Sequence, residues 1–119
     1  MRKPALAALL SLAALPAFAD EPVIEGAKAR HAANGWTIAV TLRHPDTGWD
    51  HYADGWEVLD QAGNRLGFRK LLHPHVSEQP FTRQLSGVRI PEGTKTVFIR
   101  AHCSVDGWGK REYELDLTP

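Results

Sequence analysis

The sequence contains very little sulfur. Its 119 residues include one cysteine, Cys103, and one methionine, the initiator. A single cysteine cannot form a disulfide within the chain, so a small domain of this sequence would depend on its core or on a bound ion for stability. A chain without further methionines also offers no thioether ligand to a metal. The sequence thus excludes a disulfide scaffold and a thioether metal site.

The chain also lacks net charge, because 14 Lys and Arg residues balance 14 Asp and Glu residues. That balance argues against binding nucleic acid or an anionic membrane through bulk charge. The hydrophobic fraction of 43% is ordinary for a globular protein and too high for a disordered one. We therefore expect a folded protein with no nucleic-acid partner.

The long apolar run of the sequence lies at its N-terminus. Arg2 and Lys3 precede an Ala- and Leu-rich run over residues 4–15, and Ala17-Phe18-Ala19 has the small-residue pattern of a signal-peptide cleavage site. The run is short for a transmembrane helix. The segment has no twin arginine, so Tat export is not indicated. It has no cysteine at the cleavage point, so a lipoprotein is not indicated either.

These features predict a Sec-type signal peptide over residues 1–19, cleaved after Ala19. The mature protein, residues 20–119, is then expected in the periplasm or outside the cell, without insertion into a membrane. We expect a monomer that could have a periplasmic protein partner.

Alternating apolar and polar residues dominate the mature chain and indicate β-strands. Residues 36–43, 97–103 and 113–117 alternate clearly. Weaker strands are predicted over residues 23–31, 56–60, 65–72 and 81–90. About seven strands in one domain, with Trp56 at the core of the third, predict an all-β, immunoglobulin- or fibronectin-III-like antiparallel β-sandwich. A small antiparallel barrel is the alternative.

The connections of such a sandwich alternate between its two ends. The longer loops over residues 44–55, 73–80 and 104–109 are predicted to emerge at one end, which we call the loop pole. Five of the six histidines then lie at or beside this pole. Polar residues gathered on loops above a rigid scaffold indicate a functional site.

The histidines of the loop pole suggest a metal site. His73 and His75 have the i, i+2 spacing that places two imidazoles on one side of an extended segment. We predict His73, His75, His51 and His44 as ligands, in that order. An oxygen ligand, or a residue that orients a ligand, is expected among Asp50, Asp54 and Glu78.

Imidazole and carboxylate ligands suit Zn²⁺ or Cu²⁺ equally, so the predicted cofactor is one of these two ions. The function expected from such a site is metal storage, delivery or sensing. In the alternative interpretation, His73 and His75 cap their loop by hydrogen bonding to backbone carbonyls.

Cys103 ends the inward-facing series Val97, Ile99, Ala101 and Cys103. The pattern favours a small buried core residue. A thiolate ligand or a reactive thiol is the alternative. His102 is expected on the opposite strand face, exposed or stacked.

Three aromatic residues of the loop pole, Trp49, Tyr52 and Trp108, could form a platform for a ring or a peptide. The favoured interpretation is that the two tryptophans close the open end of the core. A platform would suit a second function class, a non-enzymatic immunoglobulin-like module that recognises a protein or a glycan without a metal.

Enzymatic activity is not expected. The serines lack a G-x-S-x-G elbow, and a chain of this length leaves little room for paired carboxylates in a deep cleft. Asp50 or Asp54 beside His51 could orient an imidazole, but the serines offer no such elbow to accompany it.

Two segments of the chain are distinctive: GWDHYAD at residues 48–54 and HPHxxEQPFTR at residues 73–83. With them, the sequence resembles an uncharacterised family of small exported bacterial proteins along nearly all of its mature part. The resemblance implies a stand-alone periplasmic domain and carries no activity with it.

Overall fold

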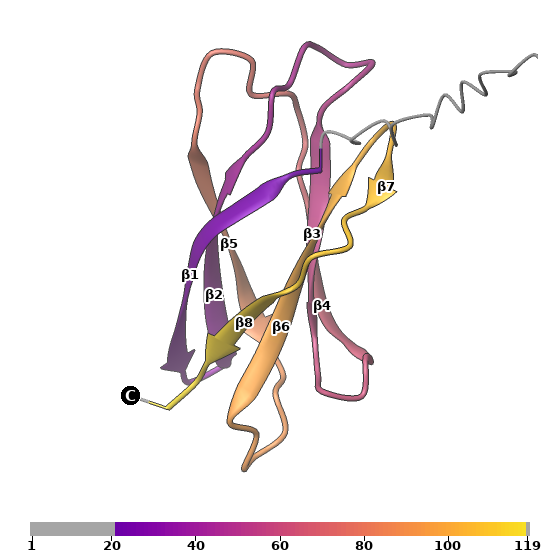
Figure 1. Cartoon of the computed structure of the whole chain (residues 1–119). Coiled ribbons are helices and arrows are strands. Elements are labelled where there is room, and N and C mark those ends of the chain that lie inside the picture. Colours follow the sequence, from indigo (N-terminus) through magenta and orange to yellow (C-terminus); the bar gives the residue numbers. More distant parts are fainter. Residues whose placement is uncertain (1–20, 119) are drawn as a thin grey trace, which may run out of the picture.

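The computed structural model describes residues 21–118, so the predicted signal peptide and its cleavage point after Ala19 lie outside the described residues. The described chain forms eight strands joined by turns and loops (Figure 1). The strands are β1 Val23–Ala32, β2 Gly35–Arg43, β3 Ala53–Leu59, β4 Arg65–Lys70, β5 Phe81–Val88, β6 Thr96–Cys103, β7 Gly107–Trp108 and β8 Tyr113–Asp116.

The strands form two antiparallel sheets. One sheet has the order β1-β2-β5, and the other has the order β4-β3-β6-β7, with β8 also paired to β6. The prediction of an all-β antiparallel sandwich is confirmed. The strand beyond the predicted seven is β7, a two-residue strand within the loop over residues 104–109. Compared with the ABED and CFG sheets of an immunoglobulin constant domain, the fourth strand has moved to the edge of the second sheet.

The core lies between the two sheets and follows the alternation of the sequence. Ile38, Val40 and Leu42 of β2 are at most 1% exposed and face the other sheet. Trp56 of β3 is fully buried at the centre of this core, where the sequence predicts a core tryptophan. Burial of such side chains supplies most of the stability of a domain that has no disulfide.

The loops between β2 and β3, β4 and β5, and β6 and β7 emerge together at one end of the sandwich (Figure 1). The short turns that follow β1, β3 and β5 lie at the other end. The structure therefore has the predicted loop pole, and the strands hold three separate stretches of sequence close to one another there.

Candidate metal centre

The centre of the loop pole is the imidazole of His44, the first residue after β2. Its side chain and that of Asp46 are both fully buried, and its Nδ1 lies 2.6 Å from Asp46 Oδ1. Because an ionised carboxylate only accepts hydrogen bonds, this contact places the proton of a neutral imidazole on Nδ1. The other nitrogen, Nε2, then presents a lone pair. It is buried and has no hydrogen-bond partner among the described residues.

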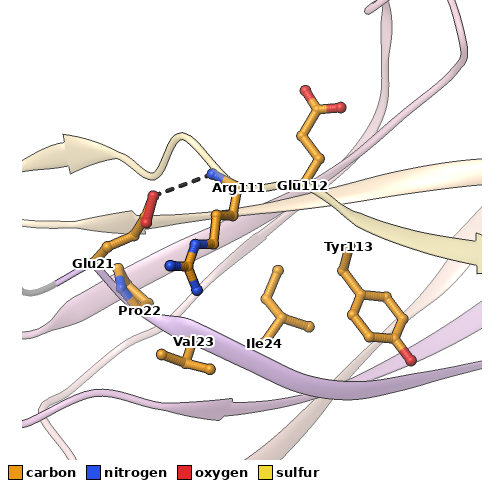
Figure 2. Close-up of a pocket in the computed structure, with 7 residues that line it drawn as sticks. All are labelled: Glu21, Pro22, Val23, Ile24, Arg111, Glu112 and Tyr113. Carbon is orange, nitrogen blue, oxygen red and sulfur yellow. Dashed lines mark hydrogen bonds between the residues drawn. The ribbon is translucent and has the colours of Figure 1, made fainter.

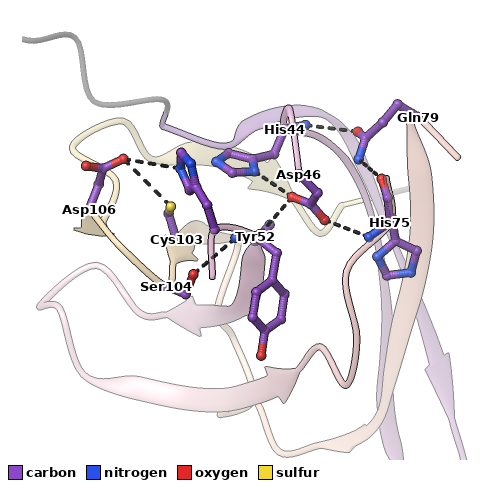
Figure 3. Close-up of polar contacts among 10 residues, drawn as sticks. His44, Asp46, Tyr52, His75, Gln79, Cys103, Ser104 and Asp106 are labelled. Atoms are coloured by element: carbon purple, nitrogen blue, oxygen red, sulfur yellow. Dashed lines mark hydrogen bonds and ion pairs between the residues drawn. The ribbon is translucent and has the colours of Figure 1, made fainter. Parts of the chain in front are cut away.

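Asp46 also holds the neighbouring loops in place (Figure 3). Its Oδ1 accepts a hydrogen bond from the backbone N–H of Ala53 at 2.9 Å, and its Oδ2 accepts one from the backbone N–H of His75 at 2.8 Å. The backbone N–H of His44 in turn donates to Gln79 Oε1 at 2.9 Å. The orientation of the His44 ring is therefore set by a network of hydrogen bonds between two loops.

His51 reaches the same point through a tight turn in the loop between β2 and β3. Its backbone N–H donates to the carbonyl of Gly48 at 3.1 Å. The next residue, Tyr52, exchanges two hydrogen bonds with Ser104, at 2.9 and 3.0 Å, and so ties this loop to the end of β6 (Figure 3). The rings of His44 and His51 meet edge to face, with their centroids 5.1 Å apart.

Cys103 is the last residue of β6 and is fully buried, as the sequence pattern favours. It also lies close to two of the histidines. His44, His51 and Cys103 each offer one ligand atom, and these three atoms lie within 4.8 Å of one another. Two imidazoles and a thiolate suit zinc or copper. The structure thus contains a His-His-Cys cluster that could hold a metal ion.

The electrostatics of the cluster favour a protonated thiol when no metal is bound. Burial is the main cause that raises the pKa of the Cys103 thiol, and the nearby Asp106 carboxylate also raises it. The thiol donates to Asp106 Oδ2 over 3.7 Å. Since only a thiolate is a strong ligand, metal binding here would release the thiol proton.

The other two predicted ligands, His73 and His75, lie outside this cluster. His75 is buried and stacks on Phe81, with the ring centroids 3.8 Å apart and an angle of 9° between the planes. Its Nε2 lies 2.8 Å from the Arg83 guanidinium, which donates to it. Burial, and then the charge of Arg83, lower the pKa of His75.

His73 is exposed, and its Nδ1 lies 2.9 Å from the carbonyl oxygen of Pro74. This contact with a backbone carbonyl fits the alternative interpretation of the sequence, in which His73 caps its loop. Its ring centroid is 4.5 Å from that of His75.

The predicted oxygen ligands also face other partners. Asp54 Oδ1 lies 2.5 Å from His102 Nδ1 on a different face of the second sheet. Glu78 pairs with Arg83 at 3.6 Å. Asp50 is exposed, and it is not part of the three-residue cluster.

The three aromatic residues do not form one platform. Trp49 is 68% exposed and meets Tyr52 edge to face at 5.6 Å. Trp108 instead packs against His102 at 4.8 Å and Phe68 at 6.3 Å, on the outer face of the second sheet. The expectation that Trp49 closes the core is wrong, because its strand-free loop carries the ring out into solvent.

Asp46 and Asp106 were not among the predicted site residues, although their spacing carried a signal. Asp46 follows His44 by two residues, which allows a short loop to fold the carboxylate onto the ring. Asp106 follows Cys103 by three residues across the turn between β6 and β7.

A separate pocket lies where β1 begins, beside the segment that leads into β8 (Figure 2). The carboxylate of Glu21 accepts a hydrogen bond from the backbone N–H of Arg111 at 3.2 Å there. The lining residues include no histidine or cysteine, so this pocket does not offer the nitrogen and sulfur ligands found at the loop pole.

Comparison with known proteins relates the chain to part of a larger one. It is 47% identical over 79 residues to a protein of Halomicrobium mukohataei named "Putative lipoprotein". The match covers 66% of this chain but 38% of that protein. The chain is thus homologous to one portion of that relative. No family model matches the chain. No solved structure matches it either.

Proposed function

We propose that this protein is an exported metal-binding protein that holds a divalent transition metal ion, Zn²⁺ or Cu²⁺, through His44, His51 and Cys103. The observation that carries the proposal is the buried Nε2 of His44. It has no hydrogen-bond partner among residues 21–118, while Asp46 holds the opposite ring nitrogen. A histidine that ligates a metal commonly has its second nitrogen held by a carboxylate in this manner.

A purely structural role explains these side chains less well. A buried polar atom without a partner costs about 1–3 kcal/mol, and His51 Nε2 is a second such atom in the same cluster. Apolar side chains would fill the space without that cost. A metal ion would satisfy both imidazole nitrogens and the Cys103 sulfur together.

The proposal narrows the predicted ligand set to two of its four histidines. His75 directs Nε2 toward the guanidinium of Arg83, and a fixed positive charge beside that nitrogen opposes the approach of a cation. His73 is exposed, and its Nδ1 lies beside the carbonyl oxygen of Pro74. Neither histidine belongs to the group of close ligand atoms that contains His44.

Export is part of the proposal. The predicted signal peptide supports it, and so does the word "lipoprotein" in the name of the relative from Halomicrobium mukohataei. Within residues 21–118, no helix has the length and apolar character needed to cross a membrane. We propose a non-enzymatic monomer whose role is metal storage, delivery or sensing.

Metal analysis of the purified protein tests the proposal. We expect stoichiometric zinc or copper and a rise in melting temperature when either ion is added to the metal-free protein. Cys103→Ser and His44→Ala should lose stoichiometric metal, whereas the His73→Ala/His75→Ala double variant should keep it. A wild-type protein that retains no metal and shows no thermal shift with either ion would overturn the proposal.

A second candidate is a binding module for a protein or a glycan. It is favoured by the exposure of Trp49 (68%) and Leu72 (67%) on the loops of the same pole. Such a module would bind its partner equally well with and without a metal chelator. Trp49→Ala would weaken that binding while leaving the metal content unchanged.

A further inference from the structure

The turn between β6 and β7 brings a fourth candidate ligand to the cluster. The carboxylate oxygen Oδ2 of Asp106 lies 3.7 Å from Cys103 Sγ and 3.8 Å from His51 Nε2. The second distance is too long for a good hydrogen bond between nitrogen and oxygen. One oxygen atom is therefore nearly equidistant from two of the three ligand atoms.

These separations suit ligands of a common ion. Metal–nitrogen and metal–oxygen bonds of about 2.0–2.2 Å and a metal–sulfur bond of about 2.3 Å place tetrahedral ligand atoms about 3.3–3.7 Å apart. The two Asp106 contacts are close to that range. Asp106 does not belong to the mutually close group of His44, His51 and Cys103. Its carboxylate must therefore move toward His44 to complete a tetrahedron.

The position of Asp106 allows this movement. The residue is exposed, and its side chain is 28% accessible in a turn that ends at Gly107, whose φ of 81° suits glycine. Within the described chain, the polar contacts of its carboxylate are those with the Cys103 thiol and the His51 ring. Both of these partners would turn to the same ion.

The other carboxylates of the pole are less suited to the role. Asp46 uses both of its oxygens, accepting from His44, Ala53 and His75. Asp54 and Glu78 pair with His102 and Arg83, respectively. Asp106 is therefore the carboxylate whose geometry leaves it available to the cluster.

We propose that Asp106 is the fourth metal ligand and the point at which the ion is exchanged, an inference that rests on the proposed metal site. His44 and Cys103 are buried and fixed by the scaffold, whereas Asp106 lies at the solvent boundary. A chelating side chain of a partner, or a small chelator, would displace this carboxylate first. The arrangement thus favours delivery of the ion over long-term storage.

The experiment compares the wild-type protein with Asp106→Asn and Asp106→Ala, using Co²⁺ and Zn²⁺ as probes. Co²⁺ bound by the wild type should give the intense visible bands of a four-coordinate tetrahedral ion and a charge-transfer band from the thiolate. Both variants should keep the charge-transfer band but change the visible bands. Zn²⁺ affinity should fall by at least about tenfold. Even substitution of a residue that only hydrogen-bonds to a ligand typically lowers metal affinity about 10–100-fold.

Asp50→Asn is the matched control, because Asp50 is an exposed aspartate of the same pole that lies outside the cluster. It should leave the spectrum and the affinity unchanged. Urea unfolding of each metal-free variant shows whether the fold is intact. Wild-type-like spectra and affinity in both Asp106 variants would overturn the fourth-ligand proposal while leaving the three-residue site standing. A wild-type protein that binds neither ion would overturn both proposals.

Discussion

Asp46 holds His44 in one orientation: the carboxylate Oδ1 and the imidazole Nδ1 are 2.6 Å apart, and both side chains are fully buried. The contact selects the tautomer whose Nε2 lone pair faces the cluster with His51 and Cys103. In the proposed metal site, this contact would make metal affinity depend on a residue that does not touch the ion.

Asp46→Asn tests this dependence. An amide can replace only one of the two accepting oxygens, so at least one buried N–H or the Nδ1 of His44 loses its acceptor. We expect metal affinity to fall about 10–100-fold. Stability should fall by about 1–3 kcal/mol. Competition with a chromophoric chelator and urea unfolding measure the two effects. Unchanged affinity would show that Asp46 serves the loops alone.

Metal affinity should rise with pH across the neutral range. Burial raises the pKa of the Cys103 thiol, so the thiol is protonated at neutral pH and must lose its proton to bind an ion. Each unit of pH below that pKa should weaken binding about tenfold for this one proton. Zn²⁺ titrations between about pH 6 and 8 check the slope, because this range lies below the ordinary pKa of a cysteine thiol.

Cys103→Ser supplies the comparison for the pH series, because a serine hydroxyl stays protonated throughout and binds weakly. Its residual affinity should show a shallower pH dependence than that of the wild type. Equal slopes in the two proteins would mean that the thiol does not bind the ion.

Stability should decrease in mild acid because of His75. Burial lowers the pKa of this histidine in the folded protein, so the unfolded chain binds a proton more readily. The free energy of unfolding is therefore highest above the pKa of about 6.5 that the histidine has in the unfolded chain. It decreases as the pH falls from there toward the lowered pKa of His75 in the folded protein.

His75→Gln should flatten this pH dependence between about pH 7 and 5, a window set by the ordinary histidine pKa. Urea midpoints of the metal-free protein at several pH values measure it. His31→Gln is the control, because His31 is exposed near the end of β1, and the turn that follows β1 lies at the opposite end of the sandwich (Figure 1). If the wild type and His75→Gln lose stability in parallel, another group is responsible.

Glu57 is expected to be a stabilising buried charge. Its side chain is 3% exposed and binds Arg65 Nε at 2.9 Å and Arg100 Nη2 at 2.6 Å. Glu57→Gln should cost about 1–3 kcal/mol. The two arginines are partly exposed, so water limits the cost. Glu25→Gln removes the exposed pair with Arg43 and should cost less than about 1 kcal/mol. Equal unfolding midpoints for the two variants would contradict this ranking.

Much of the fold could be read from local alternation. The inward positions of residues 36–42 and 97–103 face the core as their period of two predicts. Trp56 occupies the predicted core position, and the three long loops meet at one pole. β7 was not predicted, because two residues are too few to show a period.

The sequence placed His44 and His51 among the candidate ligands and left Cys103 as an alternative, but it could not show that these three side chains meet. His73-x-His75 looked like the best pair because strand spacing places both rings on one side. In the structure, the stack on Phe81 and the contact with Arg83 occupy His75 instead. Those partners lie six and eight residues further along the chain, on β5, beyond the reach of a local pattern.

The sequence by itself determined seven of the eight strands and the absence of a disulfide, since these depend on composition and on local periodicity. The alternating connections of such strands also predicted the gathering of histidines at one end. Only the tertiary structure decided that Cys103 faces His44 and His51. The alternation of a strand's sequence is the same whether its last inward side chain contacts the core or a loop. The packing of the two sheets places the end of β6 beneath the loop after β2, and that packing depends on contacts between residues far apart in the chain.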